Sequence, residues 1–152
     1  MSKIILQESI NNMYEYSISK DKWTETNTPM SQKRQSHSCL VIGDEVLVTG
    51  GLDENYNNLK STEIFDSKQR RWRTGPELPT GIHNAQLVRA KSGFDYIAYL
   101  IGGEISIARA SSAVYGNTRG FKKLLKIEDL DKERRSHVAF ILHENISETC
   151  NN

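Results

Sequence analysis

The stretch "EVLVTGGLD", from Glu45 to Asp53, decides the fold of this chain. Its β-branched residues predict a short strand, and the strand stops at two adjacent glycines, Gly50 and Gly51. Fifty-two residues later the pattern returns in "YLIGGE", with Gly102 and Gly103. A phosphate-binding loop would need further glycines, a lysine and a following helix, which "GGLDENYNN" lacks. The echo instead indicates an internal repeat, whose glycines let the backbone turn where side chains resist.

Aromatic residues give a second signal of the same repeat. The segments "EYSISKDKW", "EIFDSKQRRW" and "AVYGNTRGF" each end in a large aromatic residue, and these ends lie 49 residues apart. The ends are Trp23, Trp72 and Phe121, preceded six or seven residues earlier by Tyr16, Phe65 and Tyr115. Histidines recur as well, at His37, His83 and His137, each before a short apolar run. They lack the short ligand spacing of a zinc site, so we expect structural histidines and no metal.

Each repeat period reads as four short strands. The segments are rich in Val, Ile and aromatic residues and are bounded by Gly, Asp, Asn and Pro. In the best-defined period they are Ser38–Ile42, Val46–Thr49, Thr62–Asp66 and Arg71–Arg73. Gly43 and Asp44 suit the tight hairpin between the first two. The sequence therefore predicts a four-stranded antiparallel meander per period.

One segment has helical spacing. In "GFKKLLKIEDLDKERR" the apolar residues Phe121, Leu124, Leu125 and Leu130 are spaced roughly as on a helix. The repeat register favours a strand instead, because Phe121 falls where the two tryptophans fall. We therefore predict a strand from Phe121 to Leu124.

These residues resemble kelch repeats. The stretch "VLVTGG…STEIFDSKQRRW…PELP", Val46 to Pro79, matches the kelch pattern closely, and "YLIGG…SSAVYGNTRGF", Tyr99 to Phe121, matches with substitutions. In the second copy Ala113 stands for Glu63, Gly116 for Asp66 and Phe121 for Trp72. The resemblance covers roughly residues 13–142. It implies an all-β fold of kelch-type β-propeller blades, each of four antiparallel strands. The double glycines then shape the loops, and the aromatic residues fill the space between blades.

The expected organisation is an incomplete, open arc of about three blades. Residues 1–12 form a lead of little order, and the kelch arc covers 13–142. Within it lie a half blade at 13–25, full blades at 34–74 and 83–124, and the first strand of a further blade at 137–142; a polar tail covers 143–152. Propellers close with about 4–8 blades, so we interpret the chain as a fragment of a longer kelch protein. The alternative is self-association, in which two chains pair head to tail and complete the ring.

Composition and charge exclude several classes of protein. Lys and Arg number 20 and Asp and Glu 19, a formal net charge of +1, so the field that recruits nucleic acid or anionic membrane is missing. The N-terminal "MSKIILQESI" is too short in apolar residues for a signal peptide or a membrane span. Two cysteines form no disulfide framework. We predict a cytoplasmic protein that binds neither nucleic acid nor membranes.

The predicted function is noncatalytic protein binding. Kelch resemblance implies a scaffold that recognises a protein partner through blade loops, in many members as the substrate-recognition subunit of a ubiquitin ligase. The candidate partner-binding residues are Asp53, Glu54, Asn55, Tyr56 and Asn57 in one loop and Arg109 in the next. Alternatives that the resemblance leaves open are actin binding and a fragment of a kelch oxidase. No cluster of Tyr, His and Cys is legible around Cys39, so we predict no catalytic residue and no cofactor.

Overall fold

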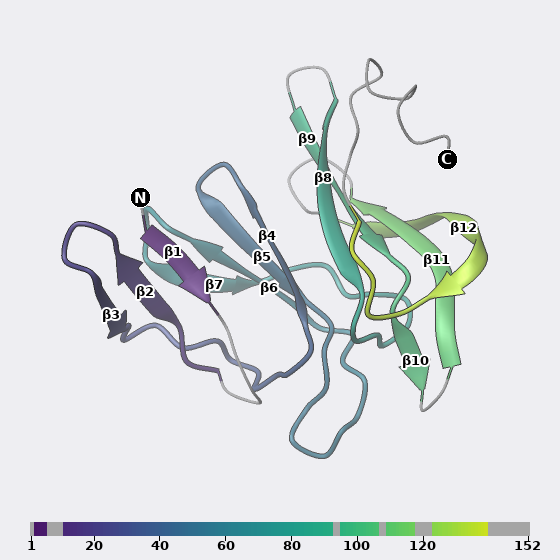
Figure 1. Ribbon diagram of the computed structural model, residues 1–152, viewed down its shortest axis with the longest axis horizontal. Helices are drawn as coiled ribbons and strands as arrows, with labels where there is room; N and C mark the ends of the chain where they lie inside the picture. The colour runs from purple at the N-terminus through teal and green to yellow at the C-terminus, as the bar shows by residue number, and fades with distance from the viewer. Residues whose placement is uncertain (1, 6–10, 93–94, 107–108, 118–122, 140–152) are drawn as a thin grey trace.

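The computed structural model describes residues 2–5, 11–92, 95–106, 109–117 and 123–139 (Figure 1). Every regular element in these ranges is a β-strand. The strands are β1 (Ser2–Ile5), β2 (Tyr14–Ser17), β3 (Lys22–Glu25), β4 (Ser38–Ile42), β5 (Glu45–Thr49), β6 (Thr62–Asp66), β7 (Arg71–Thr74), β8 (Gln86–Ser92), β9 (Asp95–Ile101), β10 (Glu104–Ser106), β11 (Arg109–Asn117) and β12 (Leu124–Arg134).

The strands form three antiparallel sheets that follow one another along the molecule (Figure 1). The N-terminal sheet has the order β1-β2-β3, and the middle sheet has the order β4-β5-β6-β7. The C-terminal sheet runs β8-β9-β11, with β10 and β12 both paired to β11. The predicted all-β architecture of four-stranded meanders is confirmed, and the described sheets form an open arc.

One face of the middle sheet packs against the N-terminal sheet. Alternate residues of β5 and β6 share this face, because successive side chains of a strand point to opposite sides. The buried cluster there consists of Met13, Met30, Val46, Val48 and Phe65. Trp72 on β7 packs at its border, with its ring centroid 5.1 Å from that of Phe65. Its Nε1–H donates to the carbonyl of Thr28 at 2.8 Å. Trp72 therefore fills the space between two sheets.

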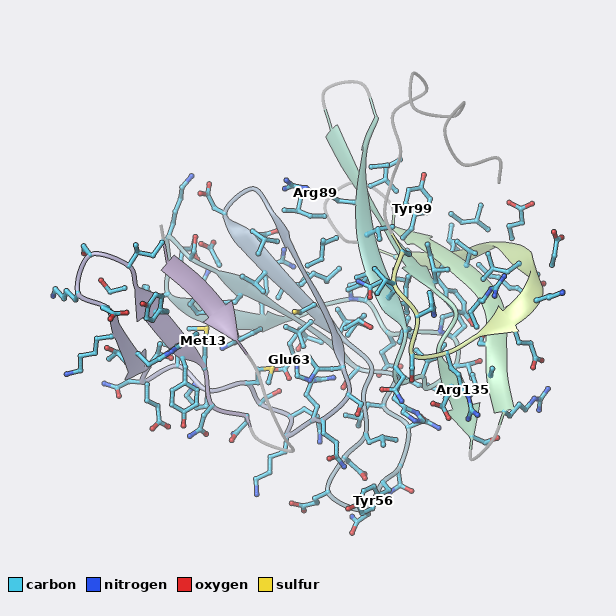
Figure 2. The ribbon with its side chains drawn as sticks, in the orientation of Figure 1. Met13, Tyr56, Glu63, Arg89, Tyr99 and Arg135 are labelled. Carbon is cyan, nitrogen blue, oxygen red and sulfur yellow. The ribbon has the colours of Figure 1, made fainter. Side chains whose placement is uncertain are left out.

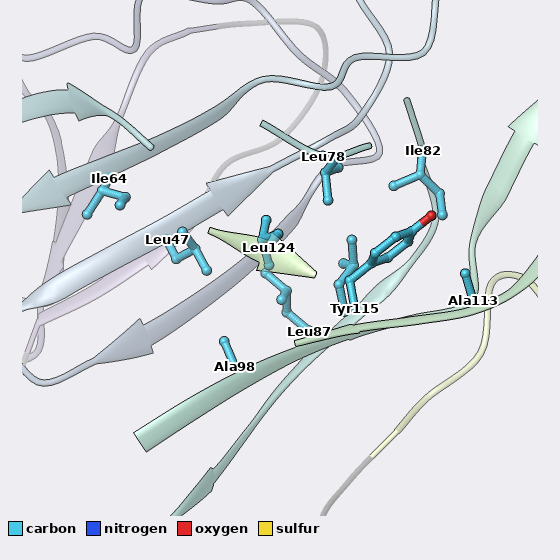
Figure 3. Packing of buried hydrophobic residues seen from close by; sticks show 10 residues of the cluster. Leu47, Ile64, Leu78, Ile82, Leu87, Ala98, Ala113, Tyr115 and Leu124 are labelled. Carbon is cyan, nitrogen blue, oxygen red and sulfur yellow. The ribbon is translucent and has the colours of Figure 1, made fainter. Parts of the chain in front are cut away.

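The opposite face of the middle sheet packs against the C-terminal sheet. Leu47 and Ile64, the alternate residues of β5 and β6, lie in a second and larger buried cluster (Figure 3). Its buried members are Leu47, Ile64, Leu78, Ile82, Leu87, Ala98, Leu100, Ala113, Tyr115 and Leu124. The middle sheet is thus covered on both sides, which explains why β5 and β6 are buried almost throughout.

The sheets are also joined by a repeated set of backbone hydrogen bonds. Asn84 N–H donates to the carbonyl of Ser36 at 3.0 Å, and Ser136 N–H donates to that of Asn84 at 3.2 Å. All three residues have a positive φ, between 47° and 52°. The second glycine of each pair donates in the same way, Gly51 to the carbonyl of Ile82 at 2.8 Å and Gly103 to that of Arg134 at 2.7 Å.

These bonds define which residues are equivalent in successive sheets. Ser36, Asn84 and Ser136 occupy one position, so His37 and His137 are equivalent to each other, whereas His83 is equivalent to Gln35. The sequence register that aligned His83 with the other two histidines is therefore wrong. It failed because the repeat length varies: equivalent residues lie 48 positions apart from Ser36 to Asn84 and 52 apart from Asn84 to Ser136.

The aromatic register also needs correction in the C-terminal sheet. Phe65 pairs with Trp72 across β6 and β7. Gly50 N–H donates to Ser61 and Gly102 N–H to Ala113, so Asn117 stands at the position of Phe65, and its partner Leu124 stands at that of Trp72. Phe121, expected there, lies outside the described residues. Leu124 is only 3% exposed, so an aliphatic side chain fills this position.

Other differences concern the ends of the arc. Residues 2–5, expected within a lead of little order, form β1, which pairs with β2 in the position that β5 has beside β6. The segment with helical spacing is strand β12 from Leu124 to Arg134, because it completes the sheet beside β11. Of the strand expected at 137–142, residues 137–139 are irregular. The rest of it, and the tail at 143–152, lie outside the described residues.

Candidate protein-interaction site

The candidate site lies on one edge of the arc, which we call the loop edge. It is formed by the connections at 50–61 and 75–85 and by residues 102–106 and 109, at the opposite end of the middle sheet from the hairpins at 43–44 and 67–70. Figure 1 shows the long connection between β5 and β6 on this edge, with β10 beside it. Residues 31–34, which lead into the middle sheet, border the same edge.

A buried ion pair fixes the segment 31–34. Arg34 is fully buried and donates to a carboxylate oxygen of Glu63 at 2.9 Å and to the carbonyl of Gly50 at 2.7 Å. Glu63 also accepts the backbone N–H groups of Ser31 and Gln32, at 2.7 and 3.1 Å. Burial opposes ionisation of Glu63, but the Ser31 and Gln32 N–H groups and Arg34 outweigh it, so the pKa of Glu63 lies below its usual value. One carboxylate thus ties the inter-sheet segment to β6.

At the next junction, between the middle and C-terminal sheets, apolar side chains occupy the positions equivalent to this ion pair. Arg34 precedes Ser36 by two residues, as Ile82 precedes Asn84, so Ile82 is its equivalent. Glu63 pairs with Val48, two residues before the first glycine, and Tyr115 pairs with Leu100 in the same position. Ile82 and Tyr115 are 1% and 5% exposed and belong to the larger buried cluster (Figure 3). The fold therefore accepts either kind of contact at this place.

His37 lies three residues after Arg34 in the sequence. Protonation of the His37 side chain should change the free energy of unfolding. Burial, together with the positive charge of Arg34, lowers the pKa of His37 from 6.5 to about 4. The unfolded chain therefore takes up the proton first as the pH falls. Stability from this group is complete above pH 6.5 and is lost between pH 6.5 and pH 4.

We therefore expect wild type to lose up to about 3 kcal/mol more than a His37→Gln variant over this range, since each pKa unit corresponds to about 1.4 kcal/mol. Urea denaturation at several pH values measures it. Carboxylates that titrate in the same range cancel in the comparison. Parallel pH profiles for the two proteins would contradict the assignment.

The first predicted binding loop is a compact turn around Asp53. One carboxylate oxygen of Asp53 accepts the N–H groups of Asn55 and Asn57, each at 2.8 Å, and the other accepts the Asn57 side-chain amide at 3.0 Å. These donors, the Asn57 side chain first, hold the pKa of Asp53 below its usual value. Tyr56 has a φ of 61° and is 74% exposed at the tip (Figure 2). The loop therefore exposes a tyrosine on a backbone that hydrogen bonds to Asp53 hold in place.

The inner side of this loop borders an open hollow. The Lys33 ammonium lies 3.5 Å from a carboxylate oxygen of Glu54, and both side chains are exposed. The hollow is lined by Asn11, Ser31, Gln32, Lys33, Asp53, Glu54 and Asn55. Its far wall is the segment that Glu63 ties down, so the buried network also shapes this part of the loop edge.

A continuous line of polar side chains, which we call the polar row, connects the two junctions on the loop edge. Asn58 contacts His83 Nδ1 at 2.7 Å through its side-chain oxygen and donates to the carbonyl of Ile105 at 3.0 Å. His83 Nε2 lies 3.9 Å from Glu104, and Glu104 accepts a hydrogen bond from Arg135 at 3.3 Å. The polar row is thus Asn58, His83, Glu104 and Arg135. Asn84 donates to Glu104 at 3.0 Å, and this bond first, then Arg135, lowers the pKa of that carboxyl.

Arg109 lies on the loop edge but apart from the 53–57 loop. It begins β11, opposite Ser106 of β10. With Thr80, Ile105 and Glu133 it lines a different hollow, between the middle and C-terminal sheets. The structure thus brings Asp53 to Asn57 together in one loop and leaves Arg109 separate.

Sequence reasoning missed the polar row and the buried ion pair. The 52-residue spacing of the double glycines aligns Leu52 with Glu104, and this would have drawn attention to a carboxylate at an apolar position. Arg34 and Glu63 carry no such signal, because residues 29 positions apart meet only once the strands pair. In the described ranges no three His, Cys, Asp or Glu side chains gather as metal ligands would. No helix in those ranges could span a membrane.

Four-stranded antiparallel sheets that pack face to face around an arc are blades of a β-propeller. Residues 33–79, which include the middle sheet and both its glycines, match the family model of the Kelch motif. Kelch-like protein 34 of Homo sapiens is 29% identical over 82 residues, which are 54% of this chain and 12% of that protein. Residues 33–79 therefore contain a kelch repeat, as the resemblance indicated.

A solved structure supports the fold. The structure of YjhT matches 89% of this chain with a TM-score of 0.69 at 17% identity, and the match covers 49% of that chain. The chain therefore spans about half of this propeller and a small part of Kelch-like protein 34.

Proposed function

We propose that this chain is a protein-interaction module that binds its partner on the loop edge. The observation that carries the proposal is Tyr56, 74% exposed at the tip of a turn that Asp53 holds in place. A tyrosine with a fixed backbone loses little conformational entropy on binding, and tyrosine is enriched at the centres of interfaces. The polar row beside it supplies hydrogen-bonding groups whose positions are already set.

The resemblance to kelch proteins favours binding of a protein partner over binding of a small ligand. The hollows on the loop edge are open and lined mainly by polar side chains, whereas small-molecule sites are enclosed and largely apolar. An open, polar edge with an exposed aromatic residue suits a protein surface. We further propose, from the kelch resemblance, that the partner is a substrate presented to a ubiquitin ligase in the cytoplasm.

Binding of the partner should depend on residues of both predicted loops. We expect a Tyr56→Ala and Arg109→Ala double variant to bind its partner about ten-fold more weakly or worse, because aromatic and arginine anchors carry most interface energy. Binding is measured by quantitative capture of proteins from cell extract, followed by titration of the captured partner.

A matched control carries Val41→Ala and Lys68→Ala, two exposed residues at the opposite end of the middle sheet. We expect this control to bind as wild type does. Equal capture by the loop-edge variant, with an unchanged circular dichroism spectrum, would refute the proposed surface. Loss of capture by the control alone would assign binding to the other edge.

A further inference from the structure

Two side chains of the polar row, His83 and Glu104, stand on a backbone contact that occurs at both junctions. His83 and Glu104 exchange backbone hydrogen bonds of 3.0 and 2.7 Å in an isolated antiparallel bridge. At the junction before it, Gln35 and Leu52 make the same bridge, with hydrogen bonds of 2.9 and 2.8 Å. The bridge therefore forms equally well with an amide and an aliphatic side chain, and the fold does not require a histidine or a carboxylate at these two positions.

The hydrogen bonds of Asn58 determine which ring nitrogen of His83 carries a proton. The Asn58 amide nitrogen donates to the carbonyl of Ile105 at 3.0 Å, and this fixes the side-chain oxygen 2.7 Å from His83 Nδ1. Because an amide oxygen can only accept, Nδ1 is the donor. In the neutral ring Nε2 is then a hydrogen-bond acceptor. Nε2 is also the ring nitrogen on the side of Glu104, 3.9 Å from Oε1 of that carboxylate.

The Glu104 carboxylate keeps acceptor positions open beside this nitrogen. Its Oε1 accepts a hydrogen bond from Asn84 at 3.0 Å, and its Oε2 accepts one from Arg135 at 3.3 Å. A carboxylate offers about four acceptor positions, so about two remain open within the described part of the chain. The 3.9 Å between Oε1 and Nε2 is too long for a direct hydrogen bond. The two atoms are therefore neighbouring acceptors that one donor group can reach together.

We propose that a lysine ammonium of the partner binds between His83 Nε2 and Glu104 Oε1, a proposal that rests on the loop edge being the partner-binding surface. An ammonium nitrogen carries three donors, and with hydrogen bonds of about 2.8 Å it reaches two acceptors 3.9 Å apart. A guanidinium fork instead matches the two oxygens of one carboxylate.

The surroundings of the acceptor pair support a charged donor. The side chains of His83 and Glu104 are each 13% exposed, so the pair is reachable but largely shielded from water, and charges attract more strongly there. Arg135 contacts the other carboxylate oxygen, so its charge weakens the contact without occupying the position. Asn58 lies two residues after Tyr56, which makes the acceptor pair continuous with the loop that exposes the tyrosine.

The test measures binding of a model ligand, Nα-acetyl-lysine amide, to the full chain by NMR at neutral pH. We expect saturable shifts of the His83 ring nitrogens and of the Asn58 side-chain amide. Nα,Nε-diacetyl-lysine amide, which has no ammonium group, should bind about ten-fold more weakly or worse, because a hydrogen bond to a charged group is lost. Nα-acetyl-arginine amide should also bind more weakly than the lysine derivative.

The first junction supplies the matching variant. His83→Gln with Glu104→Leu copies Gln35 and Leu52, so we expect it to keep the circular dichroism spectrum and to bind the lysine derivative about ten-fold more weakly or worse. Glu104→Gln removes the charge alone and should weaken binding in the same direction. The variant Val41→Ala with Lys68→Ala, at the opposite end of the middle sheet, should bind the lysine derivative as wild type does.

Three results would overturn the proposal: no preference for the charged lysine derivative over the acetylated or arginine derivative, unchanged affinity in Glu104→Gln, or ring nitrogen shifts showing a proton on Nε2 in the free protein. Capture of the partner is a separate measurement. If the loop-edge variant captures the partner normally while the lysine derivative binds at His83, only the proposed binding surface fails. If capture depends on the loop edge and the lysine derivative does not bind, only the acceptor pair fails.

Discussion

Replacing Arg34 with isoleucine is expected to lower the free energy of unfolding by about 3–5 kcal/mol. The guanidinium is fully buried and serves Glu63, Gly50 and Ser61 at once. Without it the Glu63 carboxylate, 6% exposed, loses its only charged partner among the described residues. Removing one member of a buried pair costs far more than the pair contributes, because the remaining charge stays desolvated.

The next junction supplies a sharper form of this experiment. Ile82 and Tyr115 fill the equivalent positions with apolar contact, so the double variant Arg34→Ile and Glu63→Tyr copies a solution that the fold already uses. We expect the double variant to be about 2 kcal/mol or more stable than the sum of the two single changes predicts, since contacting residues couple by up to about 3 kcal/mol. Urea denaturation of all four proteins gives the coupling energy. Additive losses would mean that the two positions act independently.

Replacing Gly50 with alanine should be nearly as costly, by about 3 kcal/mol or more. Gly50 has a φ of 65°, and a Cβ there would lie 2.3 Å from the carbonyl oxygen of Ile82. That oxygen belongs to the backbone and accepts the inter-sheet hydrogen bond from Gly51, so it cannot move without opening the junction. Thermal or urea denaturation with circular dichroism detection measures the loss.

Gly43 provides the matched control for this substitution. Its φ of 59° is nearly the same, but a Cβ there would meet nothing within 4 Å. Gly43→Ala should therefore cost only the backbone strain of a left-handed residue, about 1–2 kcal/mol. The difference between the two variants isolates the contact with the neighbouring sheet. Equal losses would show that Gly50 is needed for its dihedral angles alone.

The glycine positions predicted the register of the repeats correctly, whereas the aromatic positions did not. The double glycines are required by the backbone, through a positive φ and a close approach of the next sheet, so their spacing of 52 residues gave the register of the C-terminal sheet correctly. Aromatic residues at the inter-sheet positions are required only for their volume. Leu124 satisfies that requirement as well as Trp72 does, and the spacing built on Phe121 was misleading for this reason.

The candidate site could be predicted only in part. The polar loop after Gly51 stood out because one exposed aromatic residue lies among turn-forming residues, and Asp53 to Asn57 do form one braced loop. The polar row was not visible, because Asn58, His83, Glu104 and Arg135 belong to four segments far apart in the chain. Such residues carry no local pattern, and only the packing of successive blades brings them together.

The amino-acid sequence by itself determined the elements of this protein: short strands of alternating or fully apolar residues, glycines where the backbone must turn, and hence four-stranded kelch blades. These are local properties, set by backbone dihedral angles and by the two-residue period of a strand. The tertiary structure decided the rest, namely which residues are equivalent between blades and that Arg34 reaches Glu63. Those outcomes depend on how sheets pack on one another, and side-chain volume and charge balance can satisfy that packing in more than one way.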